Sequence, residues 1–150
     1  MADNLDSIGQ YNVGYICGVY DLFHVGHLNI LRRCKEHCKY LIVGINSDDL
    51  AETYKNRRPV INETDRMEIV RAIKYVDEVV LVDYHNHSPQ LAWSLYHYDV
   101  QFCGDDHENE LDEAKKFLQS NGSNLVFLPY TKRVSTTKLR GQLQNNGSKK

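Results

Sequence analysis

Five short apolar runs, separated by segments with helical spacing, constrain the fold of this chain more than any other feature. The apolar runs cover residues 13–17, 40–45, 78–82, 100–103 and 125–128. Continuous apolar runs of this length are typical of parallel strands that are buried on both faces. The segments that predict helices cover residues 26–37, 63–74, 88–98, 108–120 and 135–144. This alternation predicts an α/β fold, an open doubly wound parallel sheet with helices on both faces.

Length and composition narrow the classes to which the chain can belong. At 150 residues we expect one domain, residues 11–144, between flexible polar tails at residues 1–10 and 145–150. The net charge of −2 gives no support for a nucleic-acid partner. No apolar stretch is long enough to cross a bilayer, and the N-terminal segment lacks the apolar core of a signal peptide. We therefore expect a cytoplasmic protein without membrane insertion.

The run GVYDLFHVGH, residues 18–27, lies where the first predicted strand turns into the first predicted helix. A helix start presents unpaired amide N–H groups and the positive end of the helix dipole, so it attracts anions. His24 and His27 add two imidazole donors at this point, and Gly26 between them allows close approach of backbone or ligand. A single histidine there is more often a cap or a surface residue. The complete run predicts a phosphate-binding turn.

Two further polar segments are candidates for the same ligand. Ser135, Thr136 and Thr137 open the last predicted helix, where Ser135 is a natural N-cap and the other hydroxyls can meet an anion. Lys55 and Arg57 precede a proline, and they predict a mobile cationic flap that folds over triphosphate oxygens. Plain helix capping and a solvated basic loop are the respective alternatives.

The predicted topology brings these segments together. Ligands of open parallel sheets bind beyond the carboxyl ends of the strands. Loops at that edge begin at Gly104, followed by Asp105, Asp106 and His107, and at residue 129. Lys74 either reaches this crevice or pairs with a neighbouring carboxylate. A dinucleotide-dependent reductase is disfavoured, because no Gly-x-Gly-x-x-Gly follows the first strand.

With these motifs in this order, the chain resembles the cytidylyltransferases that make CDP-alcohols, most of all the glycerol-3-phosphate cytidylyltransferases. The resemblance covers about residues 13–142 and includes the segment Tyr75-Val76-Asp77-Glu78. It implies a Rossmann-like nucleotidylyltransferase fold and transfer of CMP from CTP to a phosphorylated alcohol or polyol, with release of pyrophosphate. It also implies Mg²⁺, held mainly by the triphosphate, and a homodimer with residues 75–79 near the interface.

The resemblance also implies roles for individual residues. The catalytic set is His24, His27, Lys55 and Arg57. The nucleotide-binding set is Gly18, Val19, Tyr20, Asp21, Gly26, Lys74, Gly104, Asp105, Asp106, Ser135, Thr136 and Thr137. The acceptor-binding set is Lys55, Lys74, Arg66, His107 and Lys132. Asp21 would either help to shape the turn or act as the candidate metal ligand.

The chain departs from the family pattern around the acceptor. The departures are Lys74 for an arginine, His107 for a tryptophan, and the run Tyr130-Thr131-Lys132-Arg133 for Arg-Thr-Glu-Gly. Lysine cannot make the bidentate contacts of a guanidinium. The acceptor therefore stays open between glycerol 3-phosphate, phosphocholine, phosphoethanolamine, a sugar phosphate and a flavin. A non-catalytic nucleotide-binding module is the alternative from another class.

Overall fold

The computed structural model of the chain describes residues 10–104, 111–129 and 135–148. Its five strands form one sheet in the order β3-β2-β1-β4-β5, and every recorded pairing is parallel. The strands are β1 (Tyr11–Gly18), β2 (Cys38–Asn46), β3 (Glu78–Val82), β4 (Val100–Gly104) and β5 (Asn124–Leu128). The predicted Rossmann-like α/β fold is thereby confirmed, because this strand order reverses between β1 and β4 as in doubly wound sheets.

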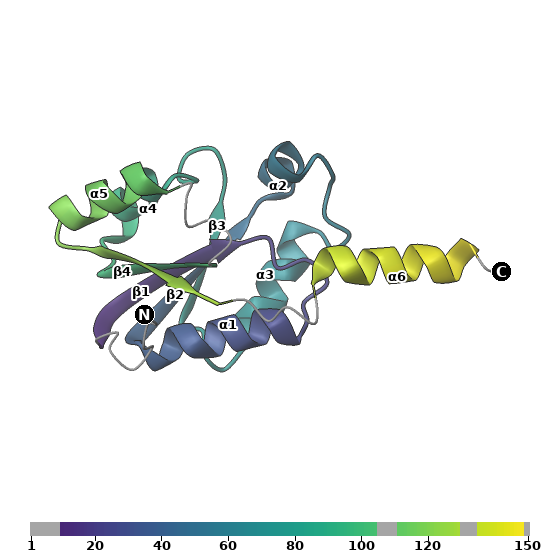
Figure 1. Ribbon diagram of the computed structural model, residues 1–150, viewed down its shortest axis with the longest axis horizontal. Helices are drawn as coiled ribbons and strands as arrows, with labels where there is room; N and C mark the ends of the chain where they lie inside the picture. Colours follow the sequence, from purple (N-terminus) through teal and green to yellow (C-terminus); the bar gives the residue numbers. More distant parts are fainter. Residues whose placement is uncertain (1–9, 105–110, 130–134, 149–150) are drawn as a thin grey trace.

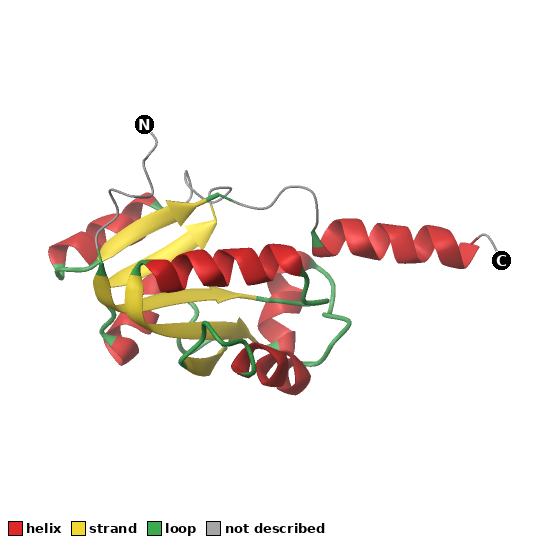
Figure 2. Ribbon diagram, turned by 90° about the horizontal axis from the view of Figure 1, so that it is seen from below, coloured by secondary structure: helices red, strands yellow, loops and turns green. Residues whose placement is uncertain are grey.

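The helices lie on both faces of the sheet, as predicted (Figures 1 and 2). They are α1 (Val25–Glu36), α2 (Asp48–Lys55), α3 (Glu63–Arg71), α4 (Pro89–Tyr96), α5 (Asp112–Ser120) and α6 (Thr136–Ser148). One apolar core joins the sheet to α1 through Leu31 and to α3 through Val70. A second core on the opposite face joins it to α4 through Ala92 and to α5 through Leu118.

Side-chain caps explain where several helices begin. Ser47 accepts a hydrogen bond from the backbone N–H of Leu50 at 3.1 Å, which starts α2. Asn62 caps α3 and Ser88 caps α4, where a proline occupies the first turn. Such caps satisfy amide groups that a helix start leaves unpaired. Helix α2 is not among the predicted helices.

Helix α6 differs from the others in its packing. It begins beside the β1–α1 turn and then projects away from the domain, as the two ribbon views agree (Figures 1 and 2). It runs to Ser148, beyond the expected end near residue 144. Among the described residues, no helix is long and apolar enough to span a bilayer. Because it begins beside the β1–α1 turn, the start of α6 lies at the carboxyl edge of the sheet, where ligands of such folds bind.

Candidate active site

The turn between β1 and α1 has an unusual backbone. Tyr20 and Leu22 adopt left-handed conformations, with φ of 56° and 51°, on either side of Asp21. A non-glycine residue in this region costs on the order of 1–3 kcal/mol, and such strain is common at functional sites. The Tyr20 ring is buried and packs 5.3 Å, between ring centroids, from His27. A Cβ at Gly18 would lie 3.1 Å from that ring, so glycine makes room for it.

His24 and His27 form a reciprocal cap at the start of α1. The Nδ1 atom of His24 accepts from the N–H of Gly26 at 3.0 Å. The Nδ1 atom of His27 accepts from the N–H of His24 at 3.1 Å. The two rings stack with centroids 3.9 Å apart. The histidines are thus both helix caps and a fixed pair.

This cap determines which nitrogen carries the proton on each ring. Backbone N–H groups can only donate, so each Nδ1 must be unprotonated and each neutral imidazole carries its proton on Nε2. Burial lowers the pKa of His27 from 6.5 to about 3, and the neighbouring His24 adds to this effect. Asp21 acts in the opposite direction but contributes less. Burial also lowers the pKa of His24. At neutral pH the pair therefore offers two Nε2–H donors without net charge.

Asp21 connects the turn between β1 and α1, residues 19–24 (the histidine turn), to two distant segments. Its carboxylate is 2 % exposed and accepts from the N–H of Val60 at 2.8 Å and of Ile61 at 2.9 Å. Arg140 of α6 donates from Nη2 to the same carboxylate at 2.5 Å. The metal role of Asp21 stays a prediction, because these three contacts still leave the carboxylate acceptor capacity. The alternative role, shaping the turn, agrees with them.

Arg66 is a structural residue, contrary to the prediction that it binds the acceptor. The side chain is completely buried, and Nη2 pairs with Asp48 at 2.7 Å. Its other nitrogens donate to the carbonyl oxygens of Val19, Asn46 and Ile61, each at 2.8 Å. These bonds hold the ends of β1 and β2 against the start of α3. A buried guanidinium used in this way has no face to offer a substrate.

The cationic flap is shorter than predicted, because Lys55 is the last residue of α2. Asn56 follows in a left-handed conformation that ends the helix, with φ of 57°. Arg57 is exposed and makes no hydrogen bond or ion pair with any residue that the structure describes. Arg58 instead pairs with Asp49 at 3.0 Å and with Glu52 of α2. Arg57 is therefore the flap arginine available to a ligand.

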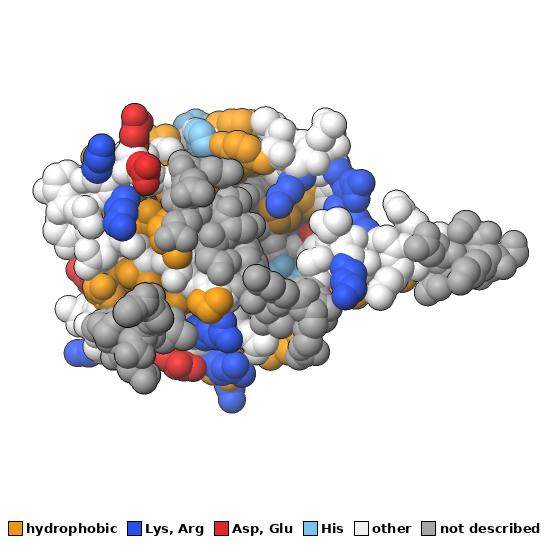
Figure 3. Space-filling view, in the orientation of Figure 1, with side chains coloured by type: hydrophobic (Ala, Val, Ile, Leu, Met, Phe, Trp, Pro, Cys, Tyr) orange, Lys and Arg blue, Asp and Glu red, His pale blue; other side chains and the backbone are white. Residues whose placement is uncertain are grey.

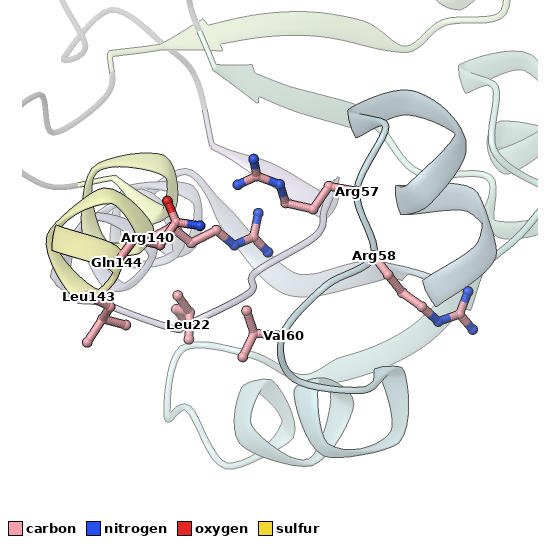
Figure 4. Close-up of a pocket in the computed structure, with 7 residues that line it drawn as sticks. All are labelled: Leu22, Arg57, Arg58, Val60, Arg140, Leu143 and Gln144. Carbon is pink, nitrogen blue, oxygen red and sulfur yellow. The ribbon is translucent and has the colours of Figure 1, made fainter. Parts of the chain in front are cut away.

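An open cavity of about 340 Å³ lies between the flap, the histidine turn and α6. Arg57 and Arg140 point toward one another across it, while Leu22 and Val60 lie on its apolar side (Figure 4). Arg58 also borders the cavity, but its guanidinium points away toward α2 (Figure 4). Basic side chains gather on this side of the molecule, beside a hollow in which a histidine is visible (Figure 3). Arg140 is not among the predicted site residues.

The first turn of α6 joins the histidine turn directly. Thr136 Oγ1 donates to the carbonyl oxygen of Asp21 at 2.8 Å, across 115 positions of sequence. Ser135 Oγ accepts from the N–H of Lys138 at 3.0 Å, which is the predicted capping contact. Thr137 is exposed. The two helix starts that were predicted to attract anions are therefore neighbours.

Lys74 lies away from this site. It precedes β3, whose first residue Glu78 pairs with Ile42 at the amino end of the parallel sheet. Its Nζ atom lies 5.3 Å from the centre of the Tyr75 ring. The histidines follow the carboxyl end of β1, whereas Lys74 precedes the amino end of β3, and its contact with nucleotide or acceptor stays a prediction.

Several predicted site residues fall outside the described parts of the chain. Gly104 ends β4 and is buried, at the edge where the prediction placed it. The predicted residues beyond the described ranges are Asp105, Asp106, His107 and Lys132. Across the described ranges, no three His, Cys, Asp or Glu side chains are grouped so as to hold a metal ion. Mg²⁺ held mainly by the triphosphate stays a prediction.

Comparison with known proteins gives one family and several relatives. The sequence profile of the family described as cytidylyltransferase-like matches residues 15–142. The glycerol-3-phosphate cytidylyltransferase of Staphylococcus aureus is 30% identical over 139 residues, which cover 88% of this chain and 95% of that protein. The FAD synthase of Pyrococcus horikoshii is 36% identical over 115 residues, covering 75% and 77%.

Two further matches differ in what they support. The bifunctional protein HldE of Hyphomonas neptunium is 30% identical over 126 residues, or 83% of this chain, but this chain spans 26% of its length. The lipopolysaccharide core biosynthesis protein of Thermoplasma volcanium superposes with a TM-score of 0.68 over 81% of this chain and 97% of its own. At 20% identity the latter shows a shared fold alone.

Proposed function

Because this chain belongs to the cytidylyltransferase-like family, we propose that it transfers CMP from CTP to a small phosphorylated alcohol, with glycerol 3-phosphate as the first candidate acceptor. Its relatives with matching length are named as a cytidylyltransferase and an FAD synthase, and they support an enzyme of the nucleotidyltransferase class. The observation that carries the proposal is the pair of Nε2–H donors fixed at the carboxyl edge of β1. Arg57 of the flap and Arg140 of α6 line a cavity to which Leu22, from the turn that carries the histidines, also contributes.

The proposed reaction is an in-line displacement. A phosphate oxygen of the acceptor attacks the α-phosphorus of CTP, the bond to the bridging oxygen breaks, and pyrophosphate leaves. The acceptor is already an anion at neutral pH, so no general base is required. His24 and His27 would donate to the oxygens on which negative charge develops, and Arg57 would hold the leaving phosphates. Catalysis then rests on positioning and charge stabilisation.

A screen of four nucleoside triphosphates against phosphorylated acceptors tests this proposal. The panel contains glycerol 3-phosphate, phosphocholine, phosphoethanolamine, a heptose phosphate and FMN, and the readout is pyrophosphate release. We expect the highest kcat/KM with CTP and glycerol 3-phosphate. Release with ATP and FMN would instead favour the second candidate, a flavin adenylyltransferase, which the relative of highest identity among those described supports. Tight CTP binding without release by any pair would identify a non-catalytic module.

We also propose that the chain forms a homodimer. Residues 75–79 would lie near the interface, at the amino end of the sheet and away from the histidines. In this segment Asp77 pairs with Lys35 at 2.5 Å, and Glu78 accepts from Tyr40 at 2.8 Å. Sedimentation equilibrium of the full chain measures the assembly, and a monomeric mass at micromolar concentration would reject it.

A further inference from the structure

Arg140 has unused hydrogen-bonding capacity next to the cavity. Its side chain is 16% exposed and donates to Asp21 from a single nitrogen, Nη2. Its Nε atom is buried and has no hydrogen-bond partner among the described residues. A guanidinium carries five N–H donors in a rigid plane, and it binds phosphate best through two of them at once. Arg140 therefore has donors left for an anion in addition to its contact with Asp21.

The cavity holds more positive than negative charge. Arg57 and Arg140 face one another across it, and Asp21 is the acid that contacts either of them (Figure 4). Like charges repel one another, and the repulsion is stronger where protein replaces water. An entering phosphate would lower this repulsion and bring oxygens for both guanidinium groups.

Asp21 does not depend on Arg140 for its own hydrogen bonds. Its two oxygens also accept from the backbone N–H groups of Val60 and Ile61. If Arg140 turns toward a ligand, the carboxylate keeps both amide contacts. The large penalty for a buried carboxylate without any partner is therefore avoided. The same amide contacts hold the base of the flap beside α6.

We infer that Asp21 is a positioning residue: it holds Arg140 in register with the base of the flap and yields it to a phosphate group that enters the cavity. This inference rests on the proposed function only in the identity of the ligand. The contact with Asp21 keeps the guanidinium extended at the cavity wall before a ligand arrives. Asp21 is then also a competitor, since its negative charge weakens the binding of an anion to the same guanidinium.

Titration of inorganic tripolyphosphate into the full chain, followed by calorimetry, tests this inference without any acceptor or turnover. We expect Asp21→Asn to tighten binding about 3- to 10-fold, because it removes the competing charge. We expect Arg140→Gln to weaken binding at least about 10-fold, since two charge-assisted bonds are lost. Arg71→Gln changes the same charge on the exposed side of α3 and should leave binding within about 2-fold.

The sign of the Asp21→Asn effect separates a residue that competes with the anion and yields Arg140 to it from a residue that only supports the turn. A residue that only supports the turn would weaken binding when replaced, so unchanged or weaker binding by Asp21→Asn overturns the inference. Unchanged binding by Arg140→Gln overturns it as well. If Asp21→Asn does not fold, Arg140→Lys decides: it keeps the charge but not the planar donors, and binding must fall at least about 3-fold. Absence of pyrophosphate release with every acceptor would reject the proposed function and leave this result standing.

Discussion

Thr136 Oγ1 and the carbonyl oxygen of Asp21 lie 2.8 Å apart and join the last helix to the first turn of the domain. The contact places the start of α6 beside the histidine pair, although 115 positions separate the two residues in sequence. Both helix starts place the positive end of a helix dipole at one edge of the sheet, where anions are favoured. The site is thus assembled from the two ends of the chain.

Replacement of His24 should separate capping from catalysis. Asparagine is a strong N-cap residue and retains an acceptor near the position of Nδ1, but it has no donor equivalent to Nε2–H. We expect His24→Asn to leave the free energy of unfolding within about 0.5 kcal/mol and to lower turnover about 10²- to 10³-fold. Urea denaturation and pyrophosphate release measure the two effects.

His24→Ala is the matched variant. It should lose turnover to the same extent and about 1 kcal/mol of stability in addition, because the Gly26 amide then has no acceptor. Equal turnover of His24→Asn and the unsubstituted protein would show that the Nε2–H donor takes no part in the reaction.

His27 should make stability depend on pH. Its imidazole has a pKa of about 3 in the folded chain and 6.5 without that environment. The unfolded chain therefore binds a proton that the folded chain does not, so this contribution is complete above pH 6.5 and is lost as the pH falls toward 3. The slope in this range approaches about 1.4 kcal/mol per pH unit.

His27→Asn keeps an acceptor for the His24 amide and removes the titrating group. Urea midpoints are compared at several pH values, from about 7, where the unfolded imidazole is mostly neutral, to about 4, where it carries a proton. The difference in stability between the two proteins must change with pH in the direction stated. Parallel profiles would contradict the assigned protonation state.

Arg66 should be among the most sensitive positions in the chain. Arg66→Met would leave Asp48 and three carbonyl oxygens without their buried partner. We expect a loss of about 3–5 kcal/mol in the free energy of unfolding. Arg71→Met, on the same helix but exposed and paired with Glu68, should cost less than about 0.5 kcal/mol. Similar urea midpoints for the two variants would show that Arg66 does not hold the strand ends.

Two glycines should respond in opposite directions to alanine. A Cβ at Gly44 would lie 2.6 Å from Val82 Cγ2 and 2.7 Å from the Tyr15 hydroxyl. We expect Gly44→Ala to destabilise the domain by about 1–3 kcal/mol. A Cβ at Gly141 would have no atom within 4 Å, so Gly141→Ala should favour helix α6 by up to about 1 kcal/mol. Thermal unfolding of the first and the helical circular dichroism of the second give the measurements, and a stabilised Gly44→Ala protein would refute the close packing.

The sequence pattern was sufficient for the sheet, since each strand is a local apolar run. The bounds of β3 agree exactly with the predicted 78–82, and Ser88 caps α4 as its position before a proline indicates. Helix α2 could also have been predicted from the sequence, because Ser47 followed by two aspartates is an ordinary helix start. The histidine turn could be located for the same reason, as its elements are adjacent in sequence.

Residues whose roles depend on distant partners could not be assigned in this way. Arg66 reads as one more helical cation, and its burial follows only from carbonyl groups supplied by other segments. Arg140 enters the site through Asp21, which lies 119 positions earlier. Lys74 is a different case: its place before β3 already indicates, from topology alone, that it lies at the opposite end of its strand from the histidine turn.

Both backbone polar groups of Ile61 are hydrogen-bonded. Its N–H donates to Asp21, and its carbonyl oxygen accepts from Arg66. On the other side of the flap, Leu50 and Ala51 keep α2 docked by burial. Between these anchors the chain from Asn56 to Pro59 can extend by at most about 14 Å. A tether of that length confines the Arg57 guanidinium to a small volume above the crevice. The effective concentration of the Arg57 guanidinium at the crevice is therefore high for every conformation of the loop.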